Sequence, residues 1–148
     1  MTKYHQVNSL SIADCSYIAG LNDADGSITL AKKHRNENRQ LIVSISNNEI
    51  QILNYVRLVT GAGHISKKRT YAEHHKINHT FKLTNRQALN LLIQITPFLR
   101  SHKKNRSELV LENYVELTPR NGKYTRELLA RREIFIKKFH EIKPSSLN

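Results

Sequence analysis

Along this chain, one segment with a helical spacing of apolar residues is followed by two segments in which apolar and polar residues alternate, and this order occurs twice. Residues 11–25 carry apolar side chains at every third position from Ile12 to Leu21, which predicts a helix. Two segments in which apolar and polar residues alternate follow it, at 27–35 and 39–47. Alternation of this kind predicts two strands, here joined by a polar turn.

The same order, one helical segment and then two alternating segments, returns in residues 49–84. Residues 49–60 have helical spacing, and residues 64–71 and 76–84 predict a second hairpin. The last strand is expected to turn three side chains to the core, namely Ile77, Phe81 and Leu83. Helices are predicted at 85–95 with Asn85 as its cap, at 103–117 and at 125–142. This order predicts one α+β domain over residues 1–148, with a four-stranded antiparallel sheet covered by helices on one face and C-terminal helices added.

The charge of the chain points to a polyanionic partner. It has 24 Lys and Arg against 12 Asp and Glu, a net charge of +12 on 148 residues. With 39% hydrophobic residues the chain has enough apolar material for a core, which argues against a disordered basic tail. Nucleic acid is the first expected partner and an acidic membrane surface the second.

Cysteine usage and the first residues bear on the compartment. Cys15 is the single cysteine, so an intrachain disulfide cannot form and a cysteine-based zinc site is not expected. The polar N-terminal residues lack the apolar core of a signal peptide. We expect an intracellular protein, in the cytoplasm or an organelle matrix, that is not secreted.

The end of the first predicted helix carries the most specific motif. Residues 18–26 read IAGLNDADG and resemble the LAGLIDADG motif, which names a family of homing endonucleases, at seven of nine positions. Ile18 and Asn22 are the departures. The order of elements after the motif is also similar to that family, and the resemblance covers most of the chain, weakening after Leu117.

The residues of the motif also have a physical interpretation of their own. Small residues recur at spacings of three and four along one stripe of the helix, which would let two helices approach closely. This stripe comprises Ala13, Ser16 or Tyr17, Gly20 and Ala24. Asp23 and Asp25 follow at the negative end of the helix dipole, where a carboxylate is unfavourable unless a cation joins it. A hard divalent cation such as Mg²⁺ would fit, although a polar helix exit before Gly26 is the simpler alternative.

The resemblance implies a role for each of these groups. In the family the last acid of the motif, here Asp25, binds the metal, with help from the backbone carbonyl of Ala24. The implied cofactor is Mg²⁺ or Mn²⁺, and Asp23 is assigned a structural role at the helix interface. The motif occurs once, and members with one motif act as homodimers. One motif supplies one Asp25, and cutting both strands needs two, so dimerisation also follows from this count, and the stripe is the expected interface.

Two further catalytic residues are implied less specifically. The family places a polar residue at the end of the second strand, where Asn47 matches and Asn48 competes. It also places a lysine after a Pro-aromatic-Leu turn, here Pro97-Phe98-Leu99. Lys103 is the prediction, with His102 and Lys104 as alternatives. A cation beside the scissile phosphate can stabilise charge that develops in the transition state.

The face of the sheet turned away from the core is predicted to contact DNA. Its residues are polar or basic and suit base edges and phosphates. They are Thr29, Ala31, Lys33, Arg35, Gln40, Ile42, Ser44, Ser46, His64, Ser66, Lys68, Lys76, Asn78, Thr80 and Lys82. A nine-residue strand spans about 30 Å at roughly 3.3 Å per residue, or about nine base pairs. A homodimer would then read a pseudo-palindrome of about 18 to 22 base pairs.

Other basic and histidine-containing segments are weighed against simpler explanations. His74, His75 and His79 suggest zinc, but adjacent residues on a strand point to opposite faces, so a hairpin tip is preferred. The last helix carries Arg131, Arg132, Lys137 and Lys138, for which a minor phosphate contact is expected, and Phe135 and Phe139, which are expected to face the core.

The resemblance implies metal-dependent hydrolysis of both strands of a long DNA site, with short 3′ overhangs, by a protein whose gene is linked to an intron or intein. Two alternatives share the fold. One is an RNA-splicing maturase, for which RNA would be the partner. The other is a DNA-binding regulator that does not cleave, against which the acid at position 25 argues.

Overall fold

Helices and strands follow one another in the predicted order. The computed structural model describes residues 5–32, 34–67 and 77–146. The elements are α1 (Ile12–Asp25), β1 (Gly26–Ala31), β2 (Gln40–Asn47), α2 (Ile50–Thr60), β3 (His64–Lys67), β4 (His79–Thr84), α3 (Asn85–Ile95), the short 3-10 helix η1 (Thr96–Phe98), α4 (His102–Leu117) and α5 (Arg126–Glu141). The α+β class predicted from the sequence is confirmed.

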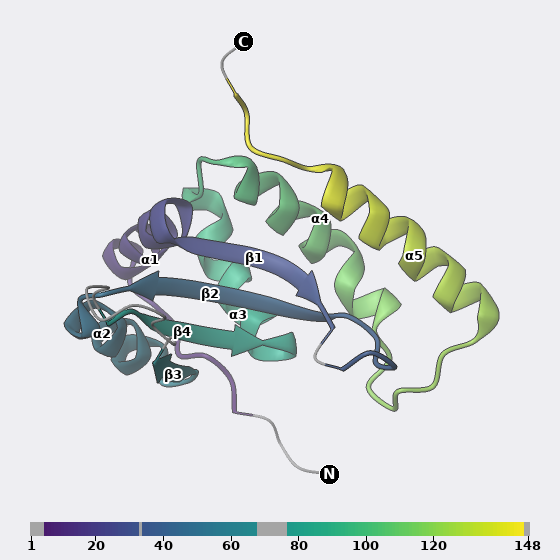
Figure 1. Ribbon diagram of the computed structural model, residues 1–148, viewed down its shortest axis with the longest axis horizontal. Coiled ribbons are helices and arrows are strands. Elements are labelled where there is room, and N and C mark those ends of the chain that lie inside the picture. The colour runs from purple at the N-terminus through teal and green to yellow at the C-terminus, as the bar shows by residue number, and fades with distance from the viewer. Residues whose placement is uncertain (1–4, 33, 68–76, 147–148) are drawn as a thin grey trace.

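The four strands form one antiparallel sheet in the order β1-β2-β4-β3. Alternate residues of the strands are fully buried, among them Ile28, Val43 and Phe81. Helices cover that side, and Figure 1 shows the sheet in front of α3 with its other face toward the viewer. The neighbouring residues of each strand therefore lie on an open face, as the alternation predicts.

Some element boundaries and single positions differ from the prediction. β1 ends at Ala31, so Arg35 lies exposed in the turn rather than in a strand. The polar run from residue 34 to residue 38 favours a turn over further sheet pairing. β4 begins at His79, which leaves Asn78 just before the strand and Ile77 48% exposed instead of in the core.

The start of α3 also differs from the expectation. Thr84 occupies the cap position, and Asn85 is the first helical residue, with a left-handed φ of 52°. Asn is one of the few residues that adopt this conformation readily. Its side-chain amide donates to Gln40 Oε1 at 3.3 Å, and its Oδ1 accepts from the Tyr114 hydroxyl at 3.2 Å. The cap prediction for Asn85 is therefore wrong.

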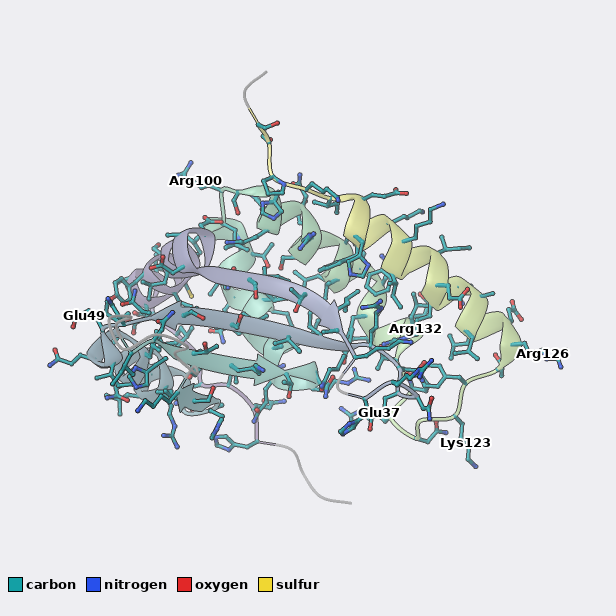
Figure 2. The ribbon with its side chains drawn as sticks, viewed as in Figure 1. Glu37, Glu49, Arg100, Lys123, Arg126 and Arg132 are labelled. Atoms are coloured by element: carbon teal, nitrogen blue, oxygen red, sulfur yellow. The ribbon has the colours of Figure 1, made fainter. Side chains whose placement is uncertain are left out.

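The C-terminal helix has a core face and a structural arginine. Phe135 and Phe139 are buried, as expected. Arg132 is also buried, and its guanidinium donates to the carbonyl oxygens of Leu117 at 2.9 Å and Arg39 at 2.5 Å. A phosphate contact by Arg132 is therefore ruled out. Figure 2 shows Arg132 and Glu49 at opposite ends of the sheet.

Three predicted DNA contacts, Lys33, Lys68 and Lys76, and the histidines His74 and His75 lie outside the described residues. Within the ranges that are described, no helix has the length and apolar character needed to cross a membrane.

Candidate active site

Asp25 is the last residue of α1 and is exposed where that helix joins β1. Its Oδ2 accepts a hydrogen bond of 3.1 Å from the side-chain amide of Asn47, at the end of β2. The Asn47 Oδ1 in turn accepts from the backbone N–H of Glu49 at 2.8 Å, which fixes the amide with its NH₂ toward Asp25. Both residues line a shallow hollow together with Ser46, Asn48 and Asn78. The structure thus brings Asn47 into contact with Asp25 and places Asn48 nearby.

Lys103 lies in the first turn of α4 and reaches the end of α1. Its Nζ donates to the backbone carbonyls of Asn22 at 2.6 Å and Asp23 at 2.8 Å. These groups carry the negative end of the helix dipole, which a cation stabilises. Burial lowers the pKa of the Lys103 ammonium below its ordinary value, while the nearby Asp23 and Asp25 act in the opposite direction. Among the candidates His102, Lys103 and Lys104, Lys103 is the one whose side chain donates to the last carbonyl groups of α1.

The carboxylate of Asp23 faces α4 and is not available in the hollow. It accepts from the backbone N–H groups of Arg100 at 2.9 Å and Ser101 at 3.2 Å, and from the Ser101 hydroxyl at 2.6 Å. Burial would raise the pKa of Asp23, but these hydrogen bonds, with Lys103 close by, outweigh burial and lower it. Asp23 therefore joins α1 to the N-terminus of α4 within one chain.

The small-residue stripe of α1 is exposed along its whole length. Ala13, Ser16, Tyr17, Gly20 and Ala24 are all open to solvent, whereas Cys15, Ile18 and Ala19 on the other side of the helix are buried. A Cβ added at Gly20 would meet nothing within 4 Å. The face that ends at Asp25 is therefore free for another molecule.

A single chain offers only part of a metal site. The oxygens of Asp25 and of the Ala24 carbonyl are the hard donors that Mg²⁺ prefers. In the described part of the chain no group of three or more His, Cys, Asp or Glu residues could hold a metal ion, and Asp23 is occupied elsewhere. The donor types fit Mg²⁺, and their small number fits a site completed by a second chain or by DNA.

The open face of the sheet carries most of the predicted contact residues. Those placed on it by strand alternation and register are Thr29, Ala31, Gln40, Ile42, Ser44, Ser46, His64, Ser66, Thr80 and Lys82. Two hydroxyl pairs, Ser27 with Ser44 at 2.7 Å and Ser46 with Thr80 at 2.9 Å, bind across neighbouring strands. Asn78 lies instead at the hollow beside Asp25. The position of these residues agrees with the prediction, while DNA contact by any of them stays a prediction.

Two residues at this site were not predicted. Ser101 caps α4 and binds Asp23, and a serine just before a helical segment is the usual signal for such a cap. Asn22 was noted only as a departure from the motif, yet it is fully buried and joins α1 to two strands. Its spacing from the buried Cys15 and Ile18 placed it on the core face of α1, where a polar residue needs an explanation.

Comparisons with known proteins find solved structures of similar fold. No protein-family model matches the chain, and neither does any curated protein. Among solved structures, the chain is similar to the homing endonuclease I-CvuI in complex with its target in the presence of Ca, with a TM-score of 0.71 and 19% identity over 92% of this chain and 87% of that one. It is similar to the archaeal intron-encoded homing endonuclease I-Vdi141I complexed with DNA, with a TM-score of 0.68 and 19% identity over 92% and 87%.

A third similar structure is the LAGLIDADG homing endonuclease I-GzeII in complex with its DNA target, with a TM-score of 0.61 and 16% identity. That alignment covers 93% of this chain and 52% of I-GzeII. These likenesses show that the chain has the fold of the LAGLIDADG homing endonucleases.

Proposed function

We propose that this chain is a site-specific, metal-dependent DNA endonuclease of the homing type that acts as a homodimer. The observation that carries the proposal is the placement of Asp25. Its carboxylate is exposed at the end of α1, in contact with Asn47, at one end of a polar sheet face. The similar structures of homing endonucleases bound to DNA support it.

The sheet supplies the DNA-binding surface in this proposal. A strand of eight residues such as β2 spans about 26 Å at roughly 3.3 Å per residue, close to eight base pairs. Hydroxyl, amide and ammonium groups on the open face can reach base edges in a major groove. The net charge of +12 supplies the positive charge that binding to phosphates requires, and Arg131 with Glu116 is the one ion pair within the described ranges.

The second copy completes the catalytic site. Packing two copies along the exposed stripe of α1 brings the two Asp25 residues to a common axis. Asp25 and the Ala24 carbonyl of each chain would hold Mg²⁺ or Mn²⁺, which, when bound, supplies a Lewis acid that stabilises charge on the phosphate oxygens. Asn47 orients the Asp25 carboxylate, and the Lys103 ammonium adds positive charge next to it.

A cleavage selection tests the proposal. Wild-type protein is incubated with a library of random DNA duplexes and Mg²⁺, and the cut molecules are sequenced. We expect double-strand cuts within one pseudo-palindromic site of about 18 to 22 base pairs, and none in the presence of a chelator. Binding to a selected duplex without cleavage under any divalent metal would instead indicate a regulator. No comparison supports the RNA alternative, and intron RNA bound in preference to every duplex would overturn the proposal.

A further inference from the structure

Asn22 is the position of the motif whose side chain departs most in chemistry. It is 0% exposed on the core side of α1, between the helix and the sheet. Its Nδ2 donates to the carbonyl oxygens of Ser27 at 3.4 Å and Ser44 at 3.1 Å, in β1 and β2. Its Oδ1 is buried and has no hydrogen-bond partner among the described residues.

The unpaired Oδ1 of Asn22 is a cost to the stability of the fold. A buried acceptor without a donor loses its hydration and gains no bond in return. An apolar side chain of similar size would avoid that loss, but it would take away the two hydrogen bonds that the carbonyl oxygens of Ser27 and Ser44 accept from the amide. The amide therefore contributes something other than burial, and its two donated hydrogen bonds are what an apolar side chain lacks.

The packing around Asn22 shows what those bonds hold. A Cβ added to Gly26 would lie 2.5 Å from both Asn22 Nδ2 and the Ser44 carbonyl oxygen, so glycine is required at the start of β1. The backbone carbonyl of Asn22 accepts from the Gly26 N–H and from Lys103 Nζ. One residue thus joins α1, β1, β2 and α4 directly beneath the turn that carries Asp25.

We infer that Asn22 is a positioning residue, whose amide fixes the turn from α1 to β1 and thereby holds the Asp25 carboxylate against Asn47. Ser44, which it binds, lies on the same strand as Asn47, so the Asn22 bridge joins the end of α1 to the strand that carries the partner of Asp25. Asn22 is buried and does not touch substrate. The effect on cleavage rests on the proposed function, but the effect on the turn does not.

Two variants test the inference. Asn22→Leu keeps the approximate shape without the amide, and Asn22→Ala removes the amide without adding bulk near Gly26. Thr60→Val is the matched control, because Thr60 is also fully buried and its hydroxyl also donates to backbone carbonyls, at the end of α2. Folding is followed by thermal denaturation, and DNA affinity is measured with Ca²⁺ in place of Mg²⁺.

Hydrogen exchange of the peptide covering residues 22–27 reports on the turn without any cleavage assay. We expect exchange there to become several-fold faster in both Asn22 variants and to stay unchanged in Thr60→Val. At saturating DNA, kcat is expected to fall about 10- to 100-fold, as for a small misplacement of a catalytic group, with the DNA Kd within about threefold of wild type.

The outcomes separate the inference from the proposed function. If wild type cuts no duplex while the Asn22 variants exchange faster at the turn, the proposed function fails and the positioning of the turn stands. If folded Asn22 variants exchange and cut at wild-type rates, the inference is overturned. An equal loss of kcat in Thr60→Val would also overturn it, because the effect would then be a general one of core polarity.

Discussion

At the scale of single residues, Asp23 and Asp25 show how two neighbouring acids are given different tasks. Asp23 accepts three hydrogen bonds from Arg100 and Ser101, just before α4, and these hold its pKa below the ordinary value despite burial. Asp25 is exposed and accepts one bond from an amide that is itself fixed. The first acid is committed to holding α1 against α4, and the second is open to a ligand.

Asp23→Asn is expected to destabilise the fold at neutral pH by about 2 kcal/mol, because hydrogen bonds to a charged acceptor are lost. A carboxyl whose folded pKa is lowered stabilises the protein above its unfolded pKa of about 3.9, and this contribution is lost as the pH falls through the folded value. Thermal denaturation should therefore show a lower melting temperature for the variant than for wild type at about pH 7. This gap in melting temperature should narrow toward about pH 3. Glu108→Gln, an exposed acid on α4, is the control and should show no gap. A gap independent of pH would contradict the assignment.

The sequence predicted part of this site for a local reason. The motif fixes Asp25 at a helix end, and strand register places Asn47 beside it, so both were predictable. The two bonds from Lys103 and the bridge made by Asn22 depend on how α4 and β2 pack against α1. Such contacts join residues far apart in the sequence, and no local pattern encodes them.

At the scale of elements, α1 has one face in the core and one in solvent. The exposed face is lined by small residues and has open space at Gly20. Close approach of two helices requires such a face, and the exposed Asp25 lies at its end. The proposed dimer therefore depends on the shape of this face.

Gly20→Leu should leave the single chain folded, because nothing lies within 4 Å of the added Cβ and leucine favours a helix more than glycine does. We expect it to prevent dimerisation and double-strand cutting. Sedimentation would show the change in mass, and Asn105→Leu, an exposed position of α4, should remain dimeric. A wild-type monomer that still cuts both strands would show that the face has another purpose.

The open face of the sheet, and not α5, is expected to determine which bases are recognised. Replacing Gln40 or Lys82 by alanine should relax the preference at particular base pairs, by about 1 to 3 kcal/mol for each good contact. Replacing Lys137 or Lys138, exposed on α5, should at most weaken all sequences alike and reduce the salt dependence. Site-selection profiles of the sheet variants and of the α5 variants test this expectation. Altered base preference in the α5 variants alone would refute it.

The element order was predictable, whereas some of the ends were not. Alternation through Ile28 and Leu30 identified β1, and the same period identified β2. The prediction extended β1 to Arg35 because polar residues fit the exposed positions of a strand as well as a turn. It put Ile77 in the core because its parity matched Phe81, although β4 begins only at His79. Periodicity thus locates the middle of a strand better than its ends.

At the scale of the whole molecule, charge and shape fit a partner with many phosphates. The net charge is +12, and a polar sheet face lies open with the candidate acid at one end. The described part of one chain contains a single available carboxylate at the site, so the proposed cutting of two strands calls for a second copy. Fold, charge and the incomplete site agree on one account, in which two chains bind a duplex and each contributes Asp25.

The most direct test of that account compares cleavage with binding in Asp25→Asn. The amide keeps the shape of the side chain but lacks the charge that holds a divalent cation. We predict that the variant binds the selected duplex with nearly wild-type affinity and does not cut it at ordinary Mg²⁺, while Asp14→Asn in the same helix cuts normally. Full cleavage by Asp25→Asn would contradict the account.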